Sequence, residues 1–195
     1  MNKHLFFVLF LFIATSGYSQ TSSGTMMLGG TVEFSSRSYQ SGSSSDAAGF
    51  TFAPSFGYFI VDNLAVGAVI TLESSRLGTG AAKSVNSSFG FGPFVRYYKF
   101  TSNEKFAFFG NADLSFSSGK YDPPSGNVIR GNGIRFAVSP GATYFLNEHW
   151  AMELSFSLFS ISSTDPNTES DDDKFTSVSF GVDSFSPGLG IRYHF

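Results

Sequence analysis

Acidic and basic side chains recur along this chain at positions where they could pair, bind ions or transfer protons. The acids are Glu33, Glu73, Asp113 and Glu153. The bases are Arg37, Arg96, Arg135 and Arg192. The acids fall in odd-numbered segments of alternating apolar and polar residues, and most of the arginines fall in the even-numbered ones. If consecutive segments are neighbouring strands, each acid has an arginine alongside it or across the interior. Ion pairing is therefore the chemistry that the pattern favours, because an unpaired buried charge is costly.

Nucleophilic catalysis would need a base within hydrogen-bond reach of a serine or threonine, and a third group that orients the base. Beyond the first 19 residues the histidines are His149, in a short turn, and His194, close to the end of the sequence. We interpret His149 as a solvated turn residue and His194 as a packed or paired interior residue. The sequence therefore predicts that the protein is not an enzyme and holds no cofactor.

A run of acids, Asp171-Asp172-Asp173, could bind a hard cation through carboxylate oxygens, with Asp165 and Glu169 close by. The run lacks the alternating acids and the glycine of a calcium-binding loop. We interpret it as a solvated acidic loop and predict no metal site, and binding of a divalent ion stays the alternative.

Composition narrows the class of protein. The 195 residues are 42% hydrophobic and 14% charged, which fits one folded domain. There are 25 phenylalanines and no cysteine, so a disulfide framework is excluded and strands, whose pleated faces suit flat rings, are favoured. The formal net charge of −3, without a basic stripe, excludes nucleic acid as a partner.

Residues 1–19 have the pattern of a secretory signal peptide. Lys3 precedes an apolar run from Leu5 to Ala14, and the small residues Gly17 and Ser19 follow at the positions of a cleavage site. The apolar run is too short to cross a bilayer, which takes about 20 residues as a helix. We therefore expect a signal peptide over residues 1–19 and one domain over residues 20–195.

From residue 26 the hydrophobic pattern has a period of two, which is typical of β-strands whose faces meet different surroundings. Four Pro-to-Tyr segments also repeat, starting at Pro54, Pro93, Pro140 and Pro187. A repeat of about 40 to 50 residues indicates one supersecondary unit, here a hairpin with its connections. Four copies predict eight strands, with the prolines as bulge or twist points.

Short turns alternate with longer polar connections. The turns are Asp62-Asn63, Ser102-Asn103 and Leu146-Asn147-Glu148, and the connections span roughly residues 39–48, 77–86, 119–132 and 162–174. This asymmetry is typical of outer-membrane barrels, whose longer loops lie outside the cell. The predicted fold is all-β: an eight-stranded antiparallel up-and-down transmembrane β-barrel.

The composition of the two faces assigns their surroundings. The polar face is mostly Gly, Ser, Ala and Thr, which suits the crowded inside of a narrow barrel rather than bulk water. The apolar face carries an expected aromatic girdle near the short turns: Tyr58, Tyr97, Tyr144, Trp150 and Tyr193. For the interior we predict two charged layers. The layer near the short turns holds Arg96, Glu153 and Arg192 with His194, and the layer near the long loops holds Glu73, Asp113 and Arg135.

The mature sequence resembles the small outer-membrane barrels of the OmpA/OmpX type along its whole length. The resemblance rests on the signal peptide, the four hairpins and the ending Gly190-Ile-Arg-Tyr193-His-Phe195, which looks like the signal that the outer-membrane assembly machinery recognises. The residue two positions before that glycine is Gly188, where a polar residue is typical. The resemblance implies insertion by that machinery from the periplasm, and it implies no particular activity. We expect the protein in the cell outer membrane, in contact with lipid and lipopolysaccharide. Divalent ions bridging the acidic loop to lipopolysaccharide stay an alternative.

Two functions remain open at this point. In the first, the barrel has a plugged, charge-paired lumen and acts as a structural or surface-interaction protein through its extracellular loops, as a monomer, with a surface ligand that the sequence does not name. In the second, it is a small pore or a conduit for small or apolar molecules. Paired interior charges favour the first, because a pore needs an unblocked axis.

Overall fold

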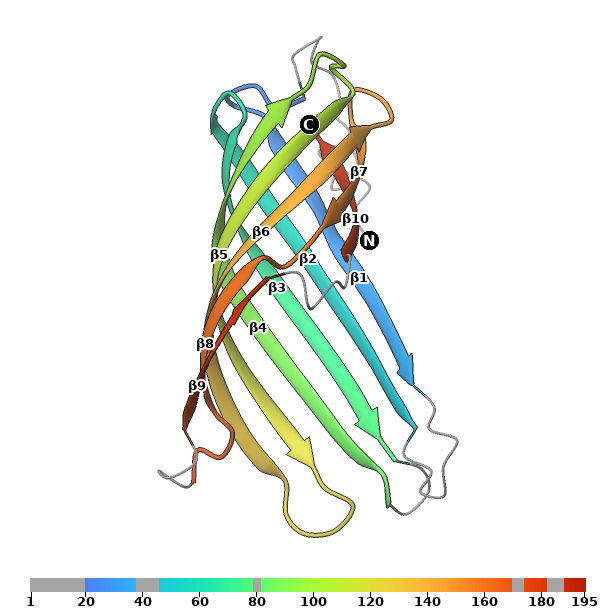
Figure 1. The fold of residues 1–195 in the computed structure, drawn as a ribbon, viewed down its shortest axis with the longest axis vertical. Coiled ribbons are helices and arrows are strands. Elements are labelled where there is room, and N and C mark those ends of the chain that lie inside the picture. The colour runs from blue at the N-terminus through green and yellow to red at the C-terminus, as the bar shows by residue number, and fades with distance from the viewer. Residues whose placement is uncertain (1–19, 38–45, 79–81, 170–173, 182–187) are drawn as a thin grey trace, which may run out of the picture.

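The computed structural model describes residues 20–37, 46–78, 82–169, 174–181 and 188–195, which form an antiparallel β-barrel (Figure 1). Its strand segments are β1 (Met26–Arg37), β2 (Ala47–Val61), β3 (Leu64–Leu77), β4 (Ser84–Phe100), β5 (Phe106–Asp122), β6 (Ile129–Phe145), β7 (Trp150–Ser155), β8 (Phe159–Asp165), β9 (Phe175–Phe180) and β10 (Gly188–His194). Segments β7 and β8 both pair with β6 and form the seventh barrel strand, while β9 and β10 contribute to the eighth. The predicted eight-stranded barrel is confirmed.

The barrel closes between its first and last strands. Each of the eight barrel strands pairs with its neighbours in the sequence, and the last closes on the first, where β10 pairs with β1 from Met27 opposite His194 to Thr31 opposite Gly190. The described residues contain no helix that is long and apolar enough to cross a membrane.

The connections differ at the two ends of the barrel. Short turns join β2 to β3, β4 to β5 and β6 to β7 at the upper end in Figure 1, and the longer connection from β5 to β6 lies at the lower end. We call these the turn end and the loop end. The third long connection is shorter than the sequence predicted, because β5 continues to Asp122 and β6 begins at Ile129. The polar strand ends lie beyond the apolar belt, so their composition resembles that of a loop.

The prolines interrupt the hydrogen-bonded ladders in two ways. At Pro54 and Pro93 one ladder loses two residue pairs, but the register is the same on both sides of the gap. Opposite Pro140 the seventh strand is irregular between Ser155 and Phe159, and its register against β6 shifts by one residue, as in a β-bulge. The predicted bulge is thus found beside one proline, and the fourth proline of the repeat lies outside the described residues.

Large side chains fill the turn end of the lumen. Met27, Phe59, Tyr98, Phe109 and Phe145 are almost completely buried there and form the core of the barrel. Inward-facing glycines on neighbouring strands leave room for the rings: a Cβ at position 141 would collide with Phe109, and one at position 67 with Phe94. Small inward residues therefore alternate with rings to give a packed interior.

Candidate functional site in the barrel lumen

The most highly connected side chain in the lumen is Glu153, on β7. Its Oε2 atom lies 2.8 Å from Nη1 of Arg96 on β4 and 2.6 Å from Nε of Arg192 on β10. Its Oε1 atom accepts hydrogen bonds from the hydroxyls of Tyr98 at 3.1 Å and Thr143 at 3.2 Å. One carboxylate therefore joins four side chains from three strands, β4, β6 and β10, and it links β7 to β4 on the opposite wall.

The two arginines use their remaining donors on neutral groups. Arg96 donates from Nε to Asn111 Oδ1 at 3.1 Å, and its guanidinium lies 4.3 Å from the centre of the Phe109 ring. Arg192 donates from Nη1 to Ser55 Oγ at 2.8 Å. Asn111 in turn donates to Asp113 at 3.1 Å, so the network extends from the packed core toward the loop end.

The network is almost dry. Arg96, Glu153 and Arg192 are 7%, 5% and 4% exposed. Two cations and one anion leave a formal charge of +1 in a region of low dielectric, where charge–charge interactions are strong. A cation that enters the lumen from the loop end would therefore meet the two guanidinium groups. We call Arg96, Glu153 and Arg192 the charged plug.

On the other side of the plug, the turn end is closed by the segment from Gln20 to Thr25. The carbonyl of Gln20 lies 2.8 Å from Nδ1 of His194, and the hydroxyl of Thr21, which is fully buried, donates to Asn63 Oδ1 at 2.6 Å. The backbone N–H of Asn63 donates to the Thr21 carbonyl. This segment ties the β2–β3 turn to the end of the last strand.

His194 belongs to this closure rather than to the charged plug, where the sequence analysis placed it. Its ring packs against Phe59 and Phe145, at centroid distances of 5.9 and 5.3 Å. His149 lies in the β6–β7 turn, where its Nδ1 is 2.9 Å from the His194 carbonyl. Neither histidine forms a hydrogen bond to a serine or threonine hydroxyl among the described residues.

The predicted charged layer near the loop end does not form. Glu33, Glu73, Asp113 and Arg135 make no ion pair with the described residues, and the side chain of Arg37 lies outside the described part of the chain. Instead Glu73 accepts a hydrogen bond from Ser88, Asp113 accepts one from Asn111, and Arg135 donates to Ser157. The prediction was wrong here because the small inward residues leave this half open, so solvated charges need no counter-ion.

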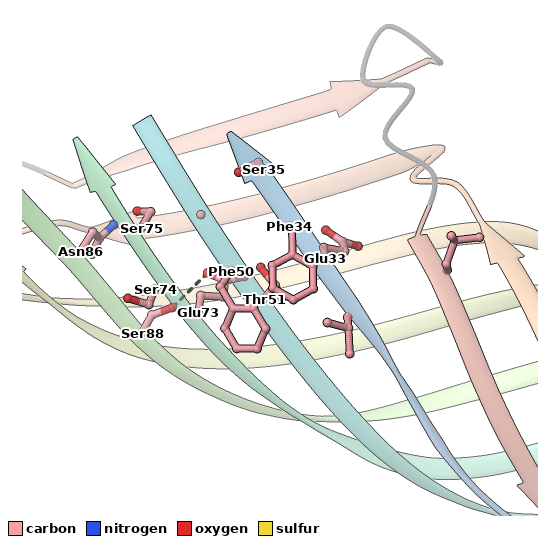
Figure 2. A pocket seen from close by; sticks show the side chains of 13 residues that line it. Glu33, Phe34, Ser35, Phe50, Thr51, Glu73, Ser74, Ser75, Asn86 and Ser88 are labelled. Carbon is pink, nitrogen blue, oxygen red and sulfur yellow. Dashed lines mark hydrogen bonds between the residues drawn. The ribbon is translucent and has the colours of Figure 1, made fainter. Parts of the chain in front are cut away.

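The loop half of the lumen contains several spaces, and two of them share Glu33, Thr51 and Glu73 in their linings. One of about 440 Å³ lies on the loop side of the plug and is lined by Glu33, Glu73, Asp113 and Arg135 among others. The second, of about 700 Å³, lies at the edge of β1 (Figure 2). Its lining includes Glu33 and Ser35, from the inward face of β1, and Phe34, from the outward face. Both faces of β1 therefore contribute to its lining.

The expected girdle residues lie on the outward face near the turn end. Tyr58, Tyr97, Tyr144 and Trp150 are 42–54% exposed, and Tyr193 is half-buried against Trp150 with ring centres 5.0 Å apart.

The predicted assembly ending lies on the last strand. Gly190 faces the lumen opposite Glu153 of β7, the Tyr193 and Phe195 rings stack at 5.9 Å, and Phe195 exchanges backbone hydrogen bonds with Met26. The end of the sequence is thus part of the closing ladder.

Several residues of the network were not identified from the sequence. Tyr98, Thr143, Ser55 and Asn111 all bind members of the charged plug. Strand parity would have found them, because each lies two residues, or an even number of residues, from an inward charge or ring on its own strand. Tyr98 was overlooked beside Tyr97, which points outward from the adjacent position.

Some predicted features lie outside the described residues. These are the signal peptide over residues 1–19 and the acidic run Asp171–Asp173. Within the described part of the chain, no cluster of three acids or histidines could hold a metal ion. Lys174 lies 3.7 Å from Asp165 at the base of the fourth loop.

Comparisons with known proteins agree with this architecture. The family model described as "Outer membrane protein beta-barrel domain" matches residues 5–194. Among solved structures, Neisserial surface protein A is 15% identical with a TM-score of 0.52, over 89% of this chain and 98% of the other. OprG from Pseudomonas aeruginosa is 16% identical with a TM-score of 0.54, over 91% and 99%. These two likenesses concern the fold alone. No curated protein sequence matches the chain.

Proposed function

Because the chain belongs to the family of outer-membrane protein β-barrel domains and is an outer-membrane barrel, we propose that it is a structural or surface-interaction protein with a closed lumen. In this proposal the turn end lies on the periplasmic side and closes the lumen, and the loop end with its loops faces the outside of the cell. No catalytic role is assigned to its side chains. The barrel works as a monomer that is inserted by the outer-membrane assembly machinery and contacts lipid and lipopolysaccharide.

One observation carries the proposal: the Glu153 carboxylate is bound by arginines from two sides of an eight-stranded lumen, directly above a layer of buried rings. A lumen of this size is only just wide enough to be filled by side chains. Filled by rings and a buried ion network, it leaves no continuous water path. A pore would need the opposite arrangement.

Planar-bilayer recording of the purified, folded barrel tests this proposal. Heat-modifiable gel mobility first establishes that the sample is folded. We expect no steady single-channel conductance from the native protein. The variant Glu153→Ala with Arg96→Ala and Arg192→Ala, which removes the charged plug, provides the comparison, and any current it carries locates the barrier. Steady, sizeable currents from the native barrel would overturn the proposal.

A second candidate, a conduit for small or apolar molecules, is favoured by the cavity at the edge of β1. Its lining combines acids and hydroxyls with Val32, Phe34, Phe50 and Leu189, so it joins the outer half of the lumen to the lipid-facing side (Figure 2). Such a route would bypass the charged plug. Uptake of an apolar fluorescent probe into proteoliposomes, compared with protein-free vesicles, separates the two candidates.

A further inference from the structure

Two cations face each other on the outward surface near the loop end. Lys120 of β5 and Arg130 of β6 are directly opposed in the β5–β6 ladder, and both side chains are exposed. Their parity places them on the same face as Phe116 and Ile134, an exposed apolar pair on the same two strands. Between the apolar pair and the cationic pair on this face, Ser118 lies opposite Asn132. The outward face thus changes from apolar to polar to cationic within two ladder steps.

The depth of this pair follows from strand geometry. Outward residues of β5 are apolar from Phe106 to Phe116, a stretch that spans about 25 Å along the membrane normal at the usual rise and tilt of barrel strands. That matches the apolar band of an outer-membrane barrel. Lys120 lies about 10 Å further out, at the level of headgroups rather than hydrocarbon.

Like charges that are directly opposite in a sheet repel each other. Neither cation has an ion-pair partner within the described chain. Asp122 is on the same face of β5, one step further out, and forms no ion pair with either of them. Two neighbouring cations that have no counter-ion among the described residues form a site for an external anion.

We propose that Lys120 and Arg130 bind the phosphate groups of a phosphorylated glycolipid in the outer leaflet. Lysine and arginine side by side suit phosphate, since arginine offers a planar fork and lysine a point charge. The apolar band immediately below, ending at Phe116 and Ile134, would contact the acyl chains of the same molecule. Ser118 and Asn132 provide neutral hydrogen-bonding groups between the two levels. A soluble anion would contact only the cationic part of this surface, whereas a phosphorylated lipid would contact its cationic, polar and apolar parts.

This inference rests on the orientation in the proposed function, with the loop end outside the cell. It does not depend on whether the lumen conducts. Conductance and lipid binding are therefore separate measurements, and a barrel that conducts would leave the lipid site intact while refuting the closed lumen.

The test uses the folded full-length barrel in detergent, with retained lipid measured by native mass spectrometry. The probe is bisphosphorylated lipid A, compared with lipid A stripped of its phosphates and with inorganic phosphate as a competitor. The variant is Lys120→Gln with Arg130→Gln. The matched control is Lys99→Gln with Lys105→Gln, which removes two exposed cations at the turn end.

We expect the native barrel and the turn-end control to bind bisphosphorylated lipid A alike. At about one kcal/mol for each interfacial cation, the Lys120/Arg130 variant should bind about 30-fold more weakly. Removal of the phosphates should reduce native binding by a similar factor. Equal binding by the native barrel and the Lys120/Arg130 variant would overturn the proposal. So would loss of binding in the turn-end control alone, or displacement by inorganic phosphate at concentrations similar to those of the lipid.

Discussion

Replacement of Glu153 by glutamine is the sharpest perturbation of the interior. The substitution keeps the shape of the side chain but removes the one anion that two buried guanidinium groups share. Breaking a buried ion pair by removing one partner typically costs about 3 to 5 kcal/mol, because the other charge stays buried without compensation. We expect a loss of unfolding free energy in that range, which corresponds to roughly two to four powers of ten in the folding equilibrium.

The assay is reversible urea unfolding in lipid vesicles. Trp150 is the single tryptophan and lies on the lipid-facing surface, so its emission reports insertion. The matched control is Glu73→Gln, which removes an inward acid whose described partner is the Ser88 hydroxyl in the open half of the lumen. The control should cost less than about 1 kcal/mol. If the two glutamine variants unfolded at the same urea concentration, the plug would not be the stabilising feature argued above.

The net charge that each substitution leaves in the charged plug leads to a second, more specific prediction. Arg96→Met leaves Glu153 paired with Arg192, a neutral combination, whereas Glu153→Gln leaves two unpaired cations. The methionine variant should therefore be the less destabilised of the two despite its larger change in shape. In a double-mutant cycle the two changes together should cost less than the sum of the single changes.

Two further expectations concern close packing and the closure of the turn end. Gly141→Ala should lower the unfolding free energy by about 1 to 3 kcal/mol, because the new methyl group would meet the Phe109 ring and the Leu154 carbonyl. The control Gly110→Ala places its methyl group in open space and should stay within about 0.5 kcal/mol of the native protein. Equal urea midpoints for the two variants would contradict this expectation. Asn63 has a φ of 66°, and its side chain and N–H bind Thr21. Asn63→Ala should therefore lower the unfolding free energy by about 1 to 3 kcal/mol, and Asn63→Gly should lower it less, because glycine tolerates the backbone angle. A larger loss for Asn63→Gly than for Asn63→Ala would refute the argument.

The sequence was informative about features that the residues of a single strand or turn encode. Period-two alternation located the strands and separated the faces, and the turns at Asp62-Asn63 and Asn147 fixed the ends of hairpins. Residues at equal distance from the short turns also end up at equal height, and for this reason Arg96, Glu153 and Arg192 could be grouped before their contacts were known. Strand order and parity are local properties, and local patterns encode them.

The sequence was less informative about distances across the lumen. Alternation places Glu73 and Arg135 inside, but whether their side chains meet depends on how much neighbouring residues fill the space between them. The contact between Gln20 and His194 joins positions 174 residues apart, and no pattern in either segment marks it. Polar strand ends such as those at Lys120 and Arg130 were interpreted as loop, because composition beyond the apolar band does not distinguish a solvated strand from a connection.

The size of the inward side chains divides the barrel into two parts with different roles. In the turn half, rings such as Phe59, Phe109 and Phe145 fill the lumen, and the charged plug is buried against them. In the loop half the same strands present mostly Ser, Gly and Thr, and cavities remain. In the proposed closed lumen, a molecule that enters from the loop end would stop at Arg96 and Arg192. We therefore expect that substitutions of Glu33, Glu73 or Asp113 change what the outer half binds without large loss of stability, whereas substitutions below Arg96 change stability first.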